Sequence, residues 1–127
     1  MDVGRLRSIP LFADVPDGDL RRIATFATED SAGPGATIVR EGDYSTELAA
    51  IEEGTAEVLQ HGKTIATLGP GDIFGETGVL EGEMRNASVV ATSPIRMVKL
   101  TTWDIKRLAP ETIARLREVV DERRVAS

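Results

Sequence analysis

The sequence contains no cysteine and a single histidine, His61. Without thiolates, and with one imidazole, the chain can form neither a disulfide nor the cysteine and histidine cluster that holds zinc. It also lacks an apolar leader at its N-terminus and any hydrophobic run long enough to span a bilayer. We therefore expect no metal centre, no crosslink, no membrane segment and a cytoplasmic location.

Positive charge is scarce too, because 15 basic residues face 21 acidic ones and leave a net charge of −6. Such a field repels nucleic acids and anionic membranes, so we expect neither as a partner. The paired arginines Arg21-Arg22 and Arg123-Arg124 are interspersed with acids and read as solvated helix surface. The acidic pair Glu52-Glu53 lies in an expected turn, where charges are usually solvated. We expect no catalytic site and no enzyme.

The 127 residues fit one domain, because a second core would have too little chain. Residues 1–28 read as a helical lead-in, in which Pro16-Asp17 opens a stretch with Leu20, Ile23 and Ala24 on one face. Ahead of it, apolar residues interrupted by Pro10 predict a short helical or irregular segment. The apolar stripe of Leu20, Ile23 and Ala24 is expected to face a core.

Residues 33–101 change to short apolar runs separated by glycine, the pattern of antiparallel strands joined by tight turns. The expected strands are Ala36–Arg40, Glu47–Glu52, Thr55–Gln60, Lys63–Leu68, Ala87–Thr92 and Ile95–Leu100. No run between them is long enough for the crossover helices that a parallel sheet requires. The fold class is therefore mainly β with flanking helices, an antiparallel β-roll of the double-stranded jelly-roll kind.

Helical periodicity returns over residues 102–125. Thr101 and Asp104 have the spacing of a capping box, and Pro110 sits where a helix start tolerates proline. Trp103 reads as a packing anchor. The last helix carries an apolar stripe that we expect to fold back on the roll as a lid or to meet a partner; its members are Ile113, Leu116, Val119 and Val120.

The segment from Phe74 to Ala91 interrupts the strand pattern. Glycines at 75 and 78 permit backbone amides to approach a ligand, and a helical turn starting there favours an anion. Arg85 follows nine positions after Glu76, and its planar guanidinium suits a phosphate. Glu76 could then accept hydrogen bonds from sugar hydroxyls. As an alternative, Arg85 pairs with an acid such as Glu83 and the glycines serve only the turn.

This segment resembles the phosphate-binding cassette of the cyclic nucleotide-binding domain family. The residues that match are Phe74, Gly75, Glu76, Gly78, Leu80, Arg85 and Ala87, with Gly35, Glu41-Gly42-Asp43, Ile51, Gly54 and Gly71-Asp72 at the expected turns. The resemblance implies that Glu76 holds the ribose 2′-hydroxyl and Arg85 the cyclic phosphate. It implies a ligand site formed by Gly75, Glu76, Thr77, Gly78, Arg85, Asn86 and Ala87.

Two departures from the family pattern bear on the ligand. Asn86 stands where a threonine would favour guanine, so we expect cyclic AMP, with cyclic GMP as the alternative, and no other cofactor. Leu48-Ala49-Ala50 replaces bulkier residues and predicts a wider base pocket. The resemblance further implies an effector domain or protein as partner, with a homodimer through the C-terminal helix as one option. A ligand-free member of the fold acting as an interaction scaffold is the competing function.

Overall fold

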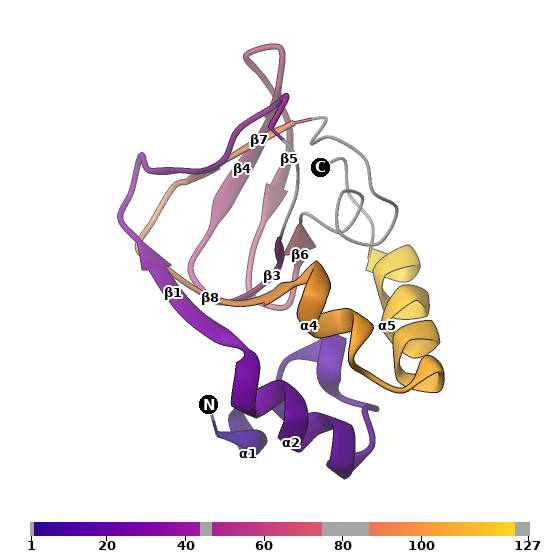
Figure 1. The fold of residues 1–127 in the computed structure, drawn as a ribbon. Helices are drawn as coiled ribbons and strands as arrows, with labels where there is room; N and C mark the ends of the chain where they lie inside the picture. The colour runs from indigo at the N-terminus through magenta and orange to yellow at the C-terminus, as the bar shows by residue number, and fades with distance from the viewer. Residues whose placement is uncertain (1, 44–46, 75–86, 124–127) are drawn as a thin grey trace.

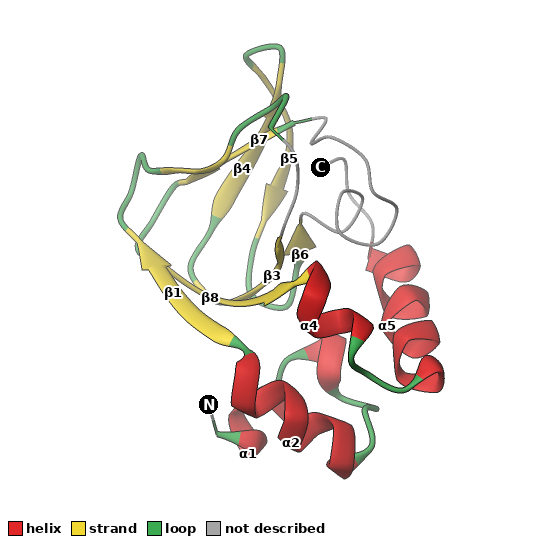
Figure 2. Ribbon diagram, in the orientation of Figure 1, coloured by secondary structure: helices red, strands yellow, loops and turns green. Residues whose placement is uncertain are grey.

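A β-roll stands on a layer of helices in the computed structural model, which describes residues 2–43, 47–74 and 87–123 (Figure 1). Two four-stranded antiparallel sheets form the roll. The helices gather at one end of it, those from before the strands beside those from after them (Figure 2). The fold class predicted from the sequence, mainly β with helices before and after the strands in the chain, is confirmed.

The helical layer is built from both ends of the chain, as α1 (Val3–Arg7), the 3-10 turn η1 (Pro10–Phe12), α2 (Asp17–Phe26), α4 (Thr102–Lys106) and α5 (Pro110–Arg123). Local sequence sets their starts. The Asp2 carboxylate accepts a hydrogen bond from the Gly4 N–H at 2.9 Å and caps α1. Thr101 and Asp104 form the expected capping box of α4. The α5 helix begins at Pro110, also as expected.

The strands divide into two sheets. Sheet A has the order β1 (Thr28–Ala32), β8 (Ile95–Thr101), β3 (Glu47–Glu53), β6 (Ile73–Phe74), and sheet B has the order β2 (Thr37–Val39), β7 (Ser88–Ala91), β4 (Ala56–Gln60), β5 (Lys63–Leu68). Each of the six predicted strands is present, with ends within one residue of those expected.

Two strands escaped the sequence prediction, and β1 moves the start of the strand region from residue 33 to Thr28. Four of the five residues of β1 are exposed, so it has no apolar alternation to reveal it. It is held by pairing with β8 instead. The other strand, β6, is only two residues long, too short for any periodicity.

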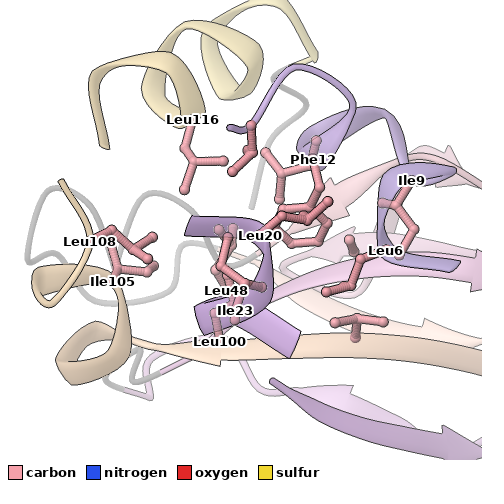
Figure 3. Close-up of a cluster of buried hydrophobic side chains, with 14 of the residues drawn as sticks. Leu6, Ile9, Phe12, Leu20, Ile23, Leu48, Leu100, Ile105, Leu108 and Leu116 are labelled. Carbon is pink, nitrogen blue, oxygen red and sulfur yellow. The ribbon is translucent and has the colours of Figure 1, made fainter. Parts of the chain in front are cut away.

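The central strands β3 and β8 separate two hydrophobic clusters. One cluster joins their helix-facing side chains to the helices, and Figure 3 shows Leu48 and Leu100 among Leu20, Ile23, Ile105 and Leu116. The other fills the roll between the sheets and includes Ile51, Val58, Phe74, Val89 and Met97. The roll is thus fixed to its helical layer through strands buried on both faces.

We expect Gly54→Ala to destabilise the fold by about 3 kcal/mol or more, because backbone strain and overlap combine there. Gly54 has φ +94°, and an added Cβ would lie 2.2 Å from the Pro94 carbonyl oxygen and 2.7 Å from the Ile95 Cα. Gly62 has φ +79° with open space around it, so Gly62→Ala carries strain alone and should cost about 1 to 2 kcal/mol. Urea unfolding of both variants measures the difference; equal losses would contradict the overlap.

Candidate functional site

The structure describes one of the seven residues predicted to bind ligand, Ala87, and the flanks of the segment that holds the others. Gly75, Glu76, Thr77, Gly78, Arg85 and Asn86 lie outside the described residues. Ala87 is fully buried and belongs to the cluster inside the roll. Its side chain can therefore set how closely a neighbour packs, but it offers no polar group to a ligand.

Residues 75–86 connect the two sheets. Phe74, the last residue before them, ends β6 in sheet A, is 1% exposed and pairs with Ala49 of β3. Ser88, just after Ala87, begins β7 in sheet B. The predicted ligand segment therefore has a buried residue at each end: Phe74 in sheet A before it, and Ala87 just ahead of sheet B after it.

The interior wall of the roll combines large and small apolar side chains. Alanines at 49, 56, 87 and 91 are each at most 2% exposed and come from both sheets. Val58 and Phe74 supply the larger surfaces. Such a wall offers dispersion contacts to an apolar or aromatic group, whereas charge for an anion has to come from other residues.

Ser88 ties the exit of the predicted segment to two other turns. Its hydroxyl accepts a hydrogen bond from the Glu41 N–H at 2.9 Å. The Glu41 carboxylate in turn accepts from the His61 N–H at 3.0 Å and lies 3.2 Å from His61 Nδ1. The His61 side chain is 83% exposed, so this contact lies at the surface. Sequence reasoning missed Ser88 as an anchor, because its partner is 47 residues away.

An arginine of α1 fixes the helical layer to sheet A. Arg5 donates to both oxygens of Glu52, at 2.7 and 2.6 Å, and also pairs with Glu29. The hydrogen bond to Glu52 is the main cause of the raised pKa of Arg5. The sequence prediction of a solvated turn charge at Glu52 is wrong: the residue lies in β3 with its side chain 10% exposed. The sequence around Glu52 could not reveal this partner, because Arg5 lies 47 residues earlier in the chain.

A second ion pair joins neighbouring strands of sheet A. Lys99 Nζ in β8 lies 2.8 Å from Asp30 Oδ2 in β1. The hydrogen bond from Lys99 lowers the pKa of the Asp30 carboxyl. Any stability from this pair is thus present above the unfolded-state pKa of Asp30 and is lost as the pH falls through the lower folded value. Since Asp30 is about half exposed, the contribution is small.

Polar contacts hold α5 against the N-terminal helices. Thr112 is 2% exposed, and its hydroxyl donates to Asp19 Oδ2 of α2. One turn later Arg115 pairs with Asp14, NH2 to Oδ2, at 2.7 Å. Leu116, from the predicted apolar stripe, is fully buried in the helical cluster. Position and attachment of α5 are therefore set by α2 and the turn before it.

The described part of the chain holds neither a cluster of metal ligands nor a helix that could span a membrane. Among residues 2–43, 47–74 and 87–123, no three or more acidic or histidine side chains come together as metal ligands would. No helix within these ranges has the length and apolar character needed to cross a bilayer.

The sequence matches the cyclic nucleotide-binding domain family over residues 29–111, which takes in every strand of the roll except the first residue of β1. The chain belongs to the cyclic nucleotide-binding domain family. The family predicted from the sequence is thereby confirmed. This is a family of regulatory binding domains and not of catalysts.

A curated relative is the cAMP-dependent protein kinase regulatory subunit of Yarrowia lipolytica, 29% identical over 117 residues. The match covers 91% of this chain and 31% of that protein, so the chain spans about a third of the relative's length.

Solved structures share the fold. The regulatory subunit of a cAMP-independent protein kinase A from Trypanosoma brucei has a TM-score of 0.83 and 24% identity, covering 94% of this chain and 43% of its own. The regulatory domain of Toxoplasma gondii protein kinase A, crystallised with cAMP, has a TM-score of 0.81 and 24% identity, covering 94% of this chain and 48% of its own.

Thr112→Val should lower the free energy of unfolding by about 1 to 3 kcal/mol, because it leaves the Asp19 carboxylate without its donor. That carboxylate is 12% exposed, and its other neighbour, Arg22, is 4.0 Å away. Thr25→Val is the matched control, since its exposed hydroxyl donates to a backbone carbonyl within α2. Urea unfolding should separate the two variants; equal stability would show that the Thr112 hydroxyl does not hold α5.

Proposed function

We propose that this domain binds a cyclic nucleotide, cyclic AMP in preference to cyclic GMP, and passes the binding event to an effector through α5. The site consists of the amides of Gly75 to Gly78 with Arg85 and Asn86 around the phosphate, Glu76 on the ribose, and Thr77 and Ala87 at the edges. The observation that carries the proposal is the family match over residues 29–111, together with the Glu76 and Arg85 spacing inside it. The chain itself is proposed to have no enzymatic activity.

The anchored ends of residues 75–86 support this assignment. Phe74 and Ala87 are both buried in the roll, so the residues between them begin and end at fixed points. Fixed ends lower the conformational entropy that a loop loses on binding, which favours affinity. The apolar wall between the sheets, with its small side chains, offers a face to a nucleobase. Of Leu48-Ala49-Ala50, only Ala49 faces the interior of the roll, whereas Leu48 and Ala50 pack in the helical cluster. The wider base pocket predicted from these three residues can therefore come from Ala49 alone.

A two-position α5 is the proposed output. This helix contacts η1 and is held by the polar contacts of Thr112 and Arg115 and by the buried side chain of Leu116. A ligand that favours one position of α5 over another shifts the population between them. The kinase regulatory subunit relative supports a protein effector, with a homodimer through α5 as the other arrangement.

The division of the chain remains a prediction, namely a single domain with a lead-in at residues 1–28, the roll at 33–101 and helices at 102–125. A cytoplasmic location remains a prediction as well.

A ligand-free interaction scaffold is the second candidate. Its support is the neighbour from Trypanosoma brucei, whose fold matches with a TM-score of 0.83 and which is described as cAMP-independent. Asn86 adds to it, because the family pattern usually has a small or hydroxyl residue after the arginine.

Calorimetric titration with cyclic AMP and cyclic GMP separates the two candidates. We expect binding of cyclic AMP, and Arg85→Ala should weaken it by about 1.5 to 3 kcal/mol, the worth of a hydrogen bond to a charged group, or about 10- to 100-fold. Arg96→Ala is the control, because Arg96 pairs with Glu53 at 3.0 Å through side chains that are both more than half exposed. No heat and no thermal shift at millimolar nucleotide would favour the scaffold.

Ser88→Ala should weaken cyclic AMP binding by about 2- to 10-fold, since one neutral hydrogen bond anchors the exit of the segment. Ser93→Ala is a matched control at the other end of β7: Ser93 Oγ accepts from the Thr55 N–H, also at 2.9 Å. Both variants should lose similar stability in urea, yet only Ser88→Ala should change affinity. Equal dissociation constants for the two variants would contradict a role for Ser88 in positioning the segment.

A further inference from the structure

Trp103 is the most exposed large hydrophobic side chain of the described residues, at 71%. The sequence prediction that it is a packing anchor is wrong, because α4 turns its other face to the core. Ile105 on that face and Leu108, which follows the helix, are each 4% exposed and join the helical cluster (Figure 3). Tryptophan is enriched in protein interfaces and among the residues that dominate binding energy. Its exposure here therefore calls for a partner.

One cation lies against the indole ring and a second follows it in the chain. Lys106 Nζ lies 5.4 Å from the ring centroid, within range of a cation–π contact. Arg107, the exposed C-cap residue of α4, is four positions after Trp103, a spacing that brings residues of one helical turn near each other. Within the described part of the chain neither cation has a carboxylate at salt-bridge distance, whereas Arg5, Arg96, Lys99 and Arg115 all do.

The position of these residues is rigid. The capping box of Thr101 and Asp104 fixes the start of α4, and the buried Ile105 fixes its rotation. Because the backbone is fixed at these points, binding has to order only the side chains of Trp103, Lys106 and Arg107. Moreover, α4 links β8 of the roll to α5 (Figure 1). A partner bound at α4 would thus sit where the roll and the last helix meet.

We propose that Trp103, Lys106 and Arg107 form a docking surface, the α4 surface, for an acidic segment of a partner protein that carries an apolar or aromatic side chain between its carboxylates. Charge complementarity selects this occupant: the chain has a net charge of −6, yet this surface presents two exposed cations with no carboxylate at salt-bridge distance among the described residues. Carboxylates would pair with Lys106 and Arg107 while an apolar side chain covers the indole. This surface does not depend on nucleotide binding.

Selection from a displayed library of random peptides, with the intact chain immobilised, tests the α4 surface. We expect the selected peptides to be rich in Asp and Glu around an apolar residue. The best peptide, made with a fluorescein label, should shift the emission of Trp103, the single tryptophan of the chain. In anisotropy titrations, Trp103→Ala and the double change Lys106→Glu with Arg107→Glu should each weaken binding at least 10-fold.

Matched controls lie on β5, where Ile65 is the other exposed large hydrophobic residue, at 43%, and Lys63 is an exposed cation two positions before it. Ile65→Ala and Lys63→Glu should leave peptide binding unchanged. Selection of neutral or basic peptides, or equal binding by Trp103→Ala, would overturn the proposal. So would sedimentation showing that the chain pairs with a second copy through Trp103, because the occupant would then not be an acidic partner.

Discussion

The fold depends on β3 and β8, whose side chains are buried on both faces. Leu48 and Leu100 face each other in register and pack against the helices, whereas Ile51 and Met97, also in register, fill the roll. Because protein interiors are close-packed, neither cluster can change its shape without pressing on these two strands. A roll with helices merely laid against it would lack this constraint. Here the helical layer and the roll share one pair of strands as a common wall.

This common wall bears on how a ligand event could reach the helices under the proposed function. Phe74, at the entrance to residues 75–86, pairs with Ala49 of β3, and the next residue of that strand, Ala50, faces the helical cluster. Contact alone carries no signal unless some element has two arrangements. The polar contacts of Thr112 and Arg115 make α5 the suitable element, because such contacts exchange with water at less cost than a buried apolar side chain.

Sequence patterns predicted what depends on local periodicity and missed what depends on distant partners. The strand Lys63–Leu68 and the capping box at Thr101 follow from residues within a few positions, and both are confirmed. By contrast, the polar strand β1 exists only because β8 pairs with it, and Glu52 is held by an arginine 47 residues away. Trp103 was misplaced because composition ranks tryptophan as buried, whereas the rotation of α4 is set by Ile105. The motif of the ligand site could be identified from the sequence, but of its seven residues the structure describes only Ala87.

The acidity of the chain makes its unpaired cations informative. The chain has 21 acidic and 15 basic residues, and Arg5, Arg96, Lys99 and Arg115 pair with carboxylates that join strands and helices. Solvent screening keeps such exposed pairs weak, so their main effect is to neutralise surface charge. The α4 surface is positive although the chain as a whole is negative. Such a local difference in electrostatic potential can guide the approach of an acidic partner. The negative charge of the whole chain repels anions. Recognition of a carboxylate or a phosphate therefore has to depend on a few cations and on the amides, hydroxyls or aromatic ring beside them.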